Sequence, residues 1–258
     1  MSNDSQQHQS INNAVEVEQL TIYNNNQALL KSLSMTVKFG EFHAIVGESG
    51  SGKSLLVRTI LNMRHSQLEY QGHVSINLNE TDAVFQDANS NMFSNVTIQK
   101  HFNAVYRTIQ SSVSKVQQQQ QIESLLLQLG FSNPKTVLNS YPFQLSGGMA
   151  QRVAFVLAMV RHPKILILDE PTSALDIKNS NVFMHYLMDI VKQQQMTVIF
   201  ITHDFNLVRQ YATEVSIMKS GEIIESGSVK DVLSAPKEDY TQQLIDIANR
   251  RAYYYADN

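Results

Sequence analysis

The sequence predicts an α/β fold, because it contains two kinds of strand with helical segments between them. Alternating apolar and polar residues, a period of two that is typical of half-buried antiparallel strands, occur at 15–18, 33–37 and 74–78. Short apolar runs, typical of buried parallel strands, occur at 42–46, 165–168 and 198–201. We therefore expect a core with parallel strands and a separate antiparallel β portion.

Helical spacing of apolar residues accounts for much of the remaining chain. One helix is predicted to follow Ser54 and to extend to Met63. A second is indicated over 122–129, where Gly130 is placed to end it, and a third lies at about 179–194.

The chain is predicted to form one domain between two tails. Residues 1–13 are expected to be a disordered tail, 14–248 a single domain with a helical insertion at about 87–160, and 249–258 a C-terminal tail. The aromatic residues at the end of the last segment could dock on a partner, but a frayed end is the simpler interpretation.

Composition narrows the classes of function. Hydrophobic residues make up 43% of the 258 residues and charged residues 17%, which is the balance of a folded globule. The net charge of −3 includes no long block of either sign, so a broad nucleic-acid-binding surface is not expected. Zero cysteines exclude disulfides, thiolate zinc sites and iron–sulfur clusters, and the histidines lack ligand spacing, so we expect no bound metal except the Mg²⁺ of a nucleotide.

Membrane-spanning segments are not expected either. The longest apolar run, 153–160, is far shorter than the ~20 residues of a transmembrane helix. The polar N-terminus has no apolar signal core. We therefore expect a cytosolic chain that meets a membrane only through a partner.

A glycine-rich segment after the apolar run at 42–46 matches a phosphate-binding loop, or P-loop. Gly47, Gly52, Lys53 and Ser54 satisfy the pattern G-x-x-x-x-G-K-[ST]. Glycines let the backbone fold closely around phosphate oxygens, and the amides of the loop and helix start supply positive potential. Lys53 is expected to reach the β- and γ-phosphates, and the Ser54 hydroxyl to ligate Mg²⁺. The predicted nucleotide contacts are Gly47, Glu48, Ser49, Gly50, Ser51, Gly52, Lys53 and Ser54.

Two acidic residues follow the apolar run at 165–168. Asp169 is positioned to hold Mg²⁺ through water, and Glu170 to polarise the attacking water. The alternative is that both are ordinary acidic turn residues after a strand.

A second glycine-rich turn, LSGGMAQR at 145–152, also places a serine and bare amides at a helix start, which is an anion-binding arrangement. One ATP has a single γ-phosphate, already enclosed by the P-loop, so this turn is expected to contact a nucleotide held by another molecule. The turn resembles the signature motif of ATP-binding-cassette (ABC) ATPases. These ATPases work as head-to-tail dimers, with ATP between one subunit's P-loop and the other's signature.

Further segments match the same family in the same order. Tyr23 is similar to the aromatic residue that stacks on adenine, Gln86 to the Q-loop glutamine, 173–176 to the D-loop and His203 to the switch histidine. Taken alone, such a tyrosine is usually packing, such a glutamine is usually on the surface and such a histidine is only sometimes a ligand. Their shared order around the P-loop identifies about 15–245 as a member of the family.

The resemblance implies a P-loop NTPase fold with a RecA-like core, an antiparallel β subdomain and a helical subdomain that carries the signature. It implies ATP and Mg²⁺ as ligands, with Gln86 sensing Mg²⁺ and the attacking water and coupling closure to a membrane subunit. His203 would contact the γ-phosphate and orient Glu170. The residues implied to contact the partner's γ-phosphate are Ser146, Gly147 and Gly148. The implied Mg²⁺ ligands are Ser54, Gln86 and Asp169.

Within the family, three segments are similar to those of ATPases from peptide and nickel importers. They are the signature ending GGMAQR, the P-loop continuation GKSLL and YTQQLI at 240–245. In particular they resemble the subunit type that pairs with a second, different ATPase. This implies two transmembrane permease subunits, an extracytoplasmic solute-binding protein, no nucleic acid, and a place at the cytoplasmic face of the membrane.

Two departures from that branch leave the solute open. A short stretch between Lys53 and Gln86 implies a trimmed β subdomain, and Glu238 and Asp239 stand where His-Pro is common. Oligopeptides, nickel or cobalt, metal–metallophore complexes and other solute classes all remain candidates.

Two functions outside transport also remain open. A soluble ABC ATPase acting on ribosomes or DNA usually has two cassettes or a long coiled-coil insertion, for which this chain has no room. A module that holds ATP without hydrolysing it would be expected to lack Glu170 or His203, and both are present.

Overall fold

The structure is a computed structural model that describes residues 13–88, 92–109 and 112–256, with side chains described as far as Arg250. The chain divides into two compact units, each described here by itself. Unit 1 comprises Met1–Asn79 and Thr197–Asn258, and unit 2 comprises Glu80–Met196. Apart from Asn13, where the first strand begins, the tail predicted at 1–13 lies outside the described residues, as do 257 and 258.

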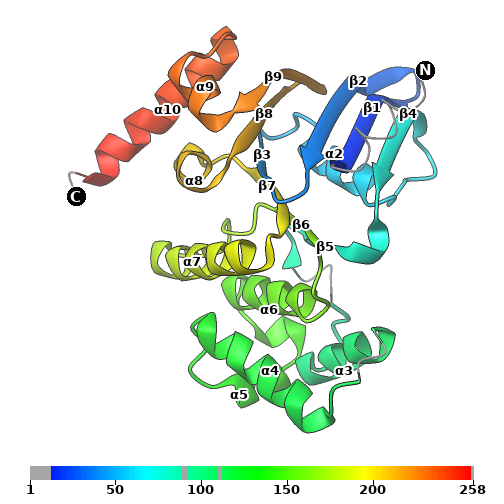
Figure 1. The fold of residues 1–258 in the computed structure, drawn as a ribbon, viewed down its shortest axis with the longest axis vertical. Helices are drawn as coiled ribbons and strands as arrows, with labels where there is room; N and C mark the ends of the chain where they lie inside the picture. Colours follow the sequence, from blue (N-terminus) through cyan, green and yellow to red (C-terminus); the bar gives the residue numbers. More distant parts are fainter. Residues whose placement is uncertain (1–12, 89–91, 110–111, 257–258) are drawn as a thin grey trace, which may run out of the picture. The chain divides into compact units, whose positions relative to one another are not determined.

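Unit 1 combines two sheets with short and long helices (Figure 1). Its elements are β1 (Asn13–Asn24), β2 (Gln27–Lys38), β3 (Phe42–Val46), α2 (Lys53–Ile60), β4 (Glu69–Ile76), β7 (Thr197–Thr202), α8 (Phe205–Tyr211), β8 (Glu214–Lys219), β9 (Glu222–Ser228), α9 (Val229–Ser234) and α10 (Asp239–Ala256). The segment predicted to be a tail from 249 therefore has a helical backbone as far as Ala256.

The three stretches with a period of two form one antiparallel sheet with the strand order β2-β1-β4. Val15 lies opposite Val37 on one side and Ile76 on the other. A bulge interrupts β1 at Gln19, where φ is +46°, and the partner strand carries Gly72 there. A Cβ on Gly72 would lie 2.5 Å from the carbonyl oxygen of Gln19, so the bulge requires a glycine.

The other strands of unit 1 follow the order β7-β3-β8-β9. β3 runs parallel to β7 and β8, and β9 runs antiparallel to β8. All five residues of β3 are buried, as its apolar sequence predicts. The α/β prediction, with parallel strands and a separate antiparallel sheet, is confirmed.

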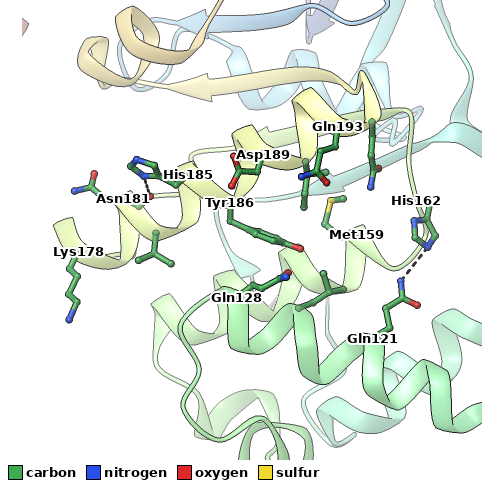
Figure 2. A pocket seen from close by; sticks show the side chains of 14 residues that line it. Gln121, Gln128, Met159, His162, Lys178, Asn181, His185, Tyr186, Asp189 and Gln193 are labelled. Carbon is green, nitrogen blue, oxygen red and sulfur yellow. Dashed lines mark hydrogen bonds between the residues drawn. The ribbon is translucent and has the colours of Figure 1, made fainter.

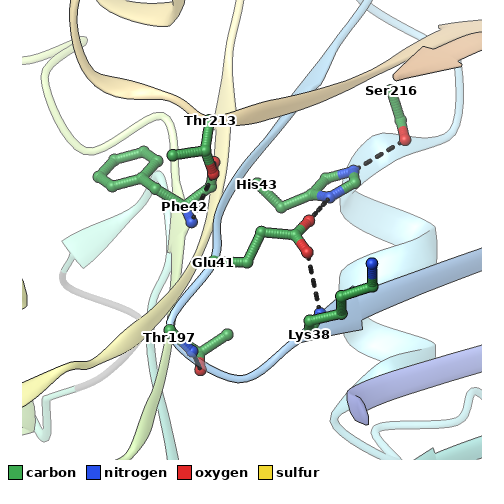
Figure 3. Close-up of polar contacts among 8 residues, drawn as sticks. Lys38, Glu41, Phe42, His43, Thr197, Thr213 and Ser216 are labelled. Carbon is green, nitrogen blue, oxygen red and sulfur yellow. Dashed lines mark hydrogen bonds and ion pairs between the residues drawn. The ribbon is translucent and has the colours of Figure 1, made fainter. Parts of the chain in front are cut away.

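A buried polar chain joins the turn before β3 to β8 (Figure 3). The backbone N–H of Lys38 donates to Glu41 Oε2 at 3.0 Å, and Glu41 Oε1 lies 2.6 Å from His43 Nδ1. His43 Nε2 lies 2.8 Å from the Ser216 hydroxyl. Burial raises the pKa of the Glu41 carboxyl, but the hydrogen bonds from His43 and Lys38 outweigh it, so the net pKa lies below the ordinary value. The chain satisfies polar groups that strand packing removes from water.

The first predicted helix is shorter than expected, because α2 ends at Ile60. Asn62 adopts a left-handed conformation with φ +57°. The amides of Asn62 and Met63 then donate to the carbonyls of Thr59 and Arg58, at 3.0 and 2.8 Å. This is a Schellman closure, and it leaves the Met63 side chain 51% exposed.

Unit 2 is mostly helical and contains one pair of parallel strands (Figure 1). Its elements are β5 (Thr81–Val84), α3 (Ile98–Thr108), α4 (Lys115–Gln128), α5 (Pro134–Asn139), the 3-10 turn Pro142–Gln144, α6 (Gly147–Met159), β6 (Ile165–Asp169) and α7 (Ile177–Gln194). From Ala150 onward α6 is buried. The helices predicted at 122–129 and 179–194 are present as α4 and α7.

Candidate functional site

The P-loop of unit 1 begins where β3 ends. Gly47 follows Val46 directly, and the chain passes through left-handed conformations at Gly50 (φ +82°) and Gly52 (φ +104°) before α2 starts at Lys53. A Cβ on Gly47 would lie 2.2 Å from the carbonyl oxygen of Met218 in β8. The loop therefore needs glycine both for its backbone angles and for its contact with the neighbouring strand.

Lys53 lies inside this loop. Its side chain is 6% exposed, and its ammonium donates to the carbonyl oxygens of Gly47 at 2.7 Å and Glu48 at 2.9 Å. The N-cap of α2 is Gly52, which has no side chain to accept from the first amides of the helix. A cation and helix-start amides at one loop fit the phosphates of a nucleotide. Ser54 is exposed on the first turn, as a Mg²⁺ ligand requires.

His203 lies at the same edge of the unit 1 sheet. It is exposed and follows β7, and Thr202 of β7 lies opposite Val46 of β3. His203 and Gly47 are thus the first residues beyond two adjacent parallel strands. Tyr23 is half-buried near the end of β1 in the antiparallel sheet, opposite Ala28 and Glu69.

Unit 2 brings together Gln86, Asp169 and Glu170. β5 and β6 are parallel with Val84 opposite Leu168, so all three residues lie at or just beyond the carboxyl ends of adjacent strands, with Asp169 the last residue of β6. Asp169 is 5% exposed, and Gln86 is exposed.

Glu170 adopts φ +49°, which is uncommon for a residue with a side chain. Its carbonyl oxygen accepts from the Ser173 amide at 3.1 Å and from the Ser173 hydroxyl at 2.9 Å. These bonds close the turn that leads into the D-loop segment 173–176, and they hold Glu170 at the end of β6.

The signature turn forms the start of α6. Ser146 is the N-cap, exposed, and its hydroxyl accepts from the Met149 amide at 3.3 Å. A Cβ on Gly148 would lie 2.9 Å from the carbonyl oxygen of Ala174, whereas one on Gly147 would lie 3.4 Å from the Ala174 side chain. The signature and the D-loop segment are therefore in direct contact within unit 2.

Sequence reasoning missed two residues that hold the signature helix, Gln151 and Arg152. Gln151 is 1% exposed, and its Nε2 donates to the carbonyl oxygen of Phe85 at 3.4 Å. Arg152 donates from Nε to Gly148 O at 3.1 Å and from Nη1 to Leu129 O at 2.8 Å. The sequence could have indicated them, because these two polar residues come directly before the apolar run at 153–160. Polar side chains next to such a run are expected to be buried and hydrogen-bonded when the run forms a buried helix.

Burial lowers the pKa of the Arg152 guanidinium, and the nearby Asp176 carboxylate partly opposes that shift. The guanidinium also lies over the Phe131 ring, with Cζ 4.4 Å from the ring centroid. Arg152 therefore joins the signature turn to the end of α4, and the Asp176 carboxylate of the D-loop segment attracts its charge.

A cavity of about 820 Å³ in unit 2 lies between α4, the end of α6 and α7 (Figure 2). Amide and imidazole side chains such as Gln121, His162 and His185 line it, over the side chains of Met159 and Tyr186. Burial raises the pKa of Tyr186 to about 12, so its hydroxyl stays neutral. The cavity is lined by none of the residues predicted to contact the nucleotide.

Comparison with known proteins gives a consistent result. The family model described as "ABC transporter" matches residues 30–173. The dipeptide transport ATP-binding protein DppD of Lactococcus lactis subsp. cremoris is 31% identical over 84% of this chain and 67% of its own length. The oligopeptide transport ATP-binding protein OppD of the same subspecies is 34% identical over 85% of this chain and 70% of its own length.

Other relatives are longer. The chain spans 41% of the peptidoglycan transport ATP-binding protein YejF of Agrobacterium fabrum, with 34% identity over 80% of this chain. Among solved structures, the dimeric cassette MJ0796 bound to ADP and Pi has a TM-score of 0.73 and 26% identity, over 83% of this chain and 98% of that one. Within the described residues, no helix is both long enough and apolar enough to cross a bilayer.

Proposed function

This chain belongs to the ABC transporter family of ATPases, and we propose that it hydrolyses ATP at its P-loop to drive a solute importer. The observation that carries the proposal is the placement of Lys53, whose ammonium is held inside a glycine loop at the start of α2. ATP with Mg²⁺ supplies the phosphoryl chemistry. Lys53 and the loop amides would bind the phosphates, and Ser54 and Asp169 would hold the cation.

The hydrolytic roles fall to residues at the ends of the parallel strands. Glu170 polarises the attacking water, His203 contacts the γ-phosphate and orients Glu170, and Gln86 responds to the cation and the water. Tyr23 stacks on the adenine. Ser146, Gly147 and Gly148 contact the ATP of a second ATPase, and the dimeric state of the MJ0796 cassette supports pairing with such a subunit.

We propose a peptide as the solute, because relatives named for dipeptide and oligopeptide transport match most of this chain. Relatives named for methionine import match it as well, so methionine is a second candidate. Nickel, cobalt and metal–metallophore complexes remain candidates on sequence grounds. The partners proposed are a second, different ATPase, two permease subunits and an extracytoplasmic binding protein, with this chain on the cytoplasmic face of the membrane.

Lys53→Ala tests the nucleotide site. We expect a large loss of affinity for ATP, because the substitution removes the cation aimed at the phosphates. Titration with a fluorescent ATP analogue and measurement of phosphate release check this. Lys31→Ala is the matched control, since the Lys31 ammonium, unlike that of Lys53, is exposed and forms an ion pair with Glu222 at 2.9 Å. Unchanged ATP affinity in Lys53→Ala would mean that the P-loop assignment is wrong.

The transport role needs a separate experiment. Fractionation of cells that express the chain with and without candidate permease subunits should move it to the membrane only when they are present. Recovery with ribosomes or DNA would instead support the non-transport alternative. A ligand screen against the co-purifying binding protein then separates peptides, methionine and metals.

A further inference from the structure

The C-terminal helix of unit 1 contacts the P-loop through one tyrosine. Tyr240 lies in the first turn of α10, its side chain is buried, and its hydroxyl oxygen accepts a hydrogen bond of 3.2 Å from the backbone N–H of Glu48. The two residues are 192 positions apart in the chain. Neither the P-loop pattern nor the roles assigned above involve this contact.

The peptide groups on either side of Glu48 are both hydrogen-bonded to side chains. The N–H of Glu48 donates to Tyr240, while its carbonyl oxygen accepts from the Lys53 ammonium at 2.9 Å. The same ammonium donates to Gly47 O at 2.7 Å. The Tyr240 hydroxyl therefore acts on the stretch of backbone that also sets where the Lys53 ammonium lies.

Tyr240 is itself firmly held. Its ring belongs to an apolar cluster with Val46 and Ile217, and Lys219 Nζ lies 4.6 Å from the ring centroid. Burial raises the pKa of Tyr240, so the group that accepts from the Glu48 amide is the neutral hydroxyl at physiological pH.

The segment that enters α10 is fixed by a carboxylate. Glu225 in β9 is 8% exposed and accepts from the backbone amides of Lys237 at 2.9 Å and Glu238 at 3.3 Å. Charge-assisted bonds of this kind restrain the start of the helix, and Tyr240 follows two residues later. The position of the hydroxyl is thus determined by β8, β9 and α10 together.

We propose that Tyr240 is a positioning residue for the P-loop, whose hydroxyl orients the Glu48 backbone and thereby the Lys53 ammonium toward nucleotide phosphates. The inference rests on the proposed binding of ATP at this loop. Affinity for ATP then depends on how α10 is seated, although α10 supplies no atom to the nucleotide.

Tyr240→Phe tests the proposal, because it removes the hydroxyl and keeps the ring. We expect ATP to bind roughly three- to tenfold more weakly, the range for one neutral hydrogen bond. Amide hydrogen exchange, measured in the absence of nucleotide, should become faster at Glu48. Adenosine affinity should not change, since adenosine carries no phosphate.

Tyr70→Phe is the matched control. The Tyr70 hydroxyl accepts from the backbone N–H of His65 at 2.9 Å, and the Arg64 guanidinium lies 5.0 Å from its ring centroid. The Tyr70→Phe variant therefore loses the same kind of hydrogen bond in the same unit, at a residue of β4 that is not part of the P-loop. We expect a comparable change in thermal stability and unchanged ATP affinity.

The outcomes separate cleanly. If ATP affinity and Glu48 exchange are unchanged in Tyr240→Phe while Lys53→Ala loses ATP, the proposal is wrong and the proposed function stands. Equal weakening in the Tyr240 and Tyr70 variants also overturns it, because the effect would then be one of general stability. If Lys53→Ala still binds ATP, the proposed function itself fails. Should Tyr240→Phe not fold, Lys219→Leu keeps the hydroxyl but loosens the ring, and faster exchange at Glu48 is again expected.

Discussion

At the scale of single residues, glycines are required by packing as well as by ligand binding. A Cβ on Gly47 would lie 2.2 Å from Met218 O, and a Cβ on Gly148 would lie 2.9 Å from Ala174 O. Both distances are below any normal contact, and both neighbours are backbone atoms that cannot rotate away. The P-loop and the signature turn thus each need a glycine where another segment passes close by, in addition to any contact with phosphate.

Gly148→Ala should therefore differ from Gly147→Ala. Gly147 is the first residue of α6, and a Cβ there would lie 3.4 Å from the Ala174 side chain, an ordinary contact, so Gly147→Ala should be neutral or slightly stabilising. Gly148→Ala should instead destabilise by about 1–3 kcal/mol, because the D-loop backbone must shift. Urea unfolding of both variants measures the difference. Equal stabilities would show that the D-loop yields without cost.

At the scale of elements, β5 and α6 are tied together within unit 2. Gln151 of α6 donates to Phe85 O, next to Gln86, and Arg161 after α6 pairs with Asp82 of β5 at 2.9 Å between Nε and Oδ2. α6 begins at the signature and β5 leads to the Q-loop. The signature and the Q-loop are therefore connected through the polar contacts between α6 and β5.

Asp82→Asn tests the electrostatics of this pair. Burial raises the pKa of Asp82 from 3.8 to about 6, although Arg161 and the Ala83 amide oppose the shift. The folded state thus binds the proton more tightly than the unfolded state, so this contribution to stability is present at low pH and is lost as pH rises from about 4 to above 6. Relative to Asp82→Asn, the wild type should lose up to about 3 kcal/mol over that range. Urea unfolding of both proteins at several pH values measures it, and parallel pH profiles would contradict the shift.

At the scale of the whole molecule, the chain carries two glycine-rich turns, which we propose contact two different nucleotides. The P-loop lies in unit 1 and the signature in unit 2. If Ser146 serves an ATP held by the partner, each hydrolytic site needs two chains. This chain alone should then hydrolyse ATP slowly, and the partner ATPase and permease should raise its turnover.

Ser146→Arg distinguishes the two sites of the proposed dimer. In a mixed complex that carries the substitution in this subunit only, hydrolysis should stop at the site whose P-loop belongs to the partner. This chain's own ATP affinity should be nearly unchanged. Site-specific nucleotide trapping measures both. Ser114→Arg, at another exposed N-cap serine in unit 2, controls for loss of a helix cap. A block at this chain's own P-loop would rule out the head-to-tail arrangement.

The sequence by itself determined most of the strands and the motif residues that follow them. Runs such as 42–46 and 165–168 are apolar because strands buried on both faces exclude water, and β3 and β6 occupy them. The strands also determine where the motif residues lie, since Gly47 and Asp169 are within one residue of the ends of β3 and β6. Buried strands and the motif residues at their ends depend on residues that are close in sequence, so the pattern of apolar and polar residues is enough to predict them.

Only the tertiary structure decided which distant groups meet. The Tyr240 hydroxyl reaches the Glu48 amide across 192 positions, and Arg152 joins the carbonyls of Gly148 and Leu129. No periodicity encodes these partners, because a hydrogen bond needs two groups within about 3 Å and only packing of whole elements brings them there. The early end of α2 is a different case, because it depends on the backbone angle of Asn62, a local feature that the spacing of apolar residues does not record.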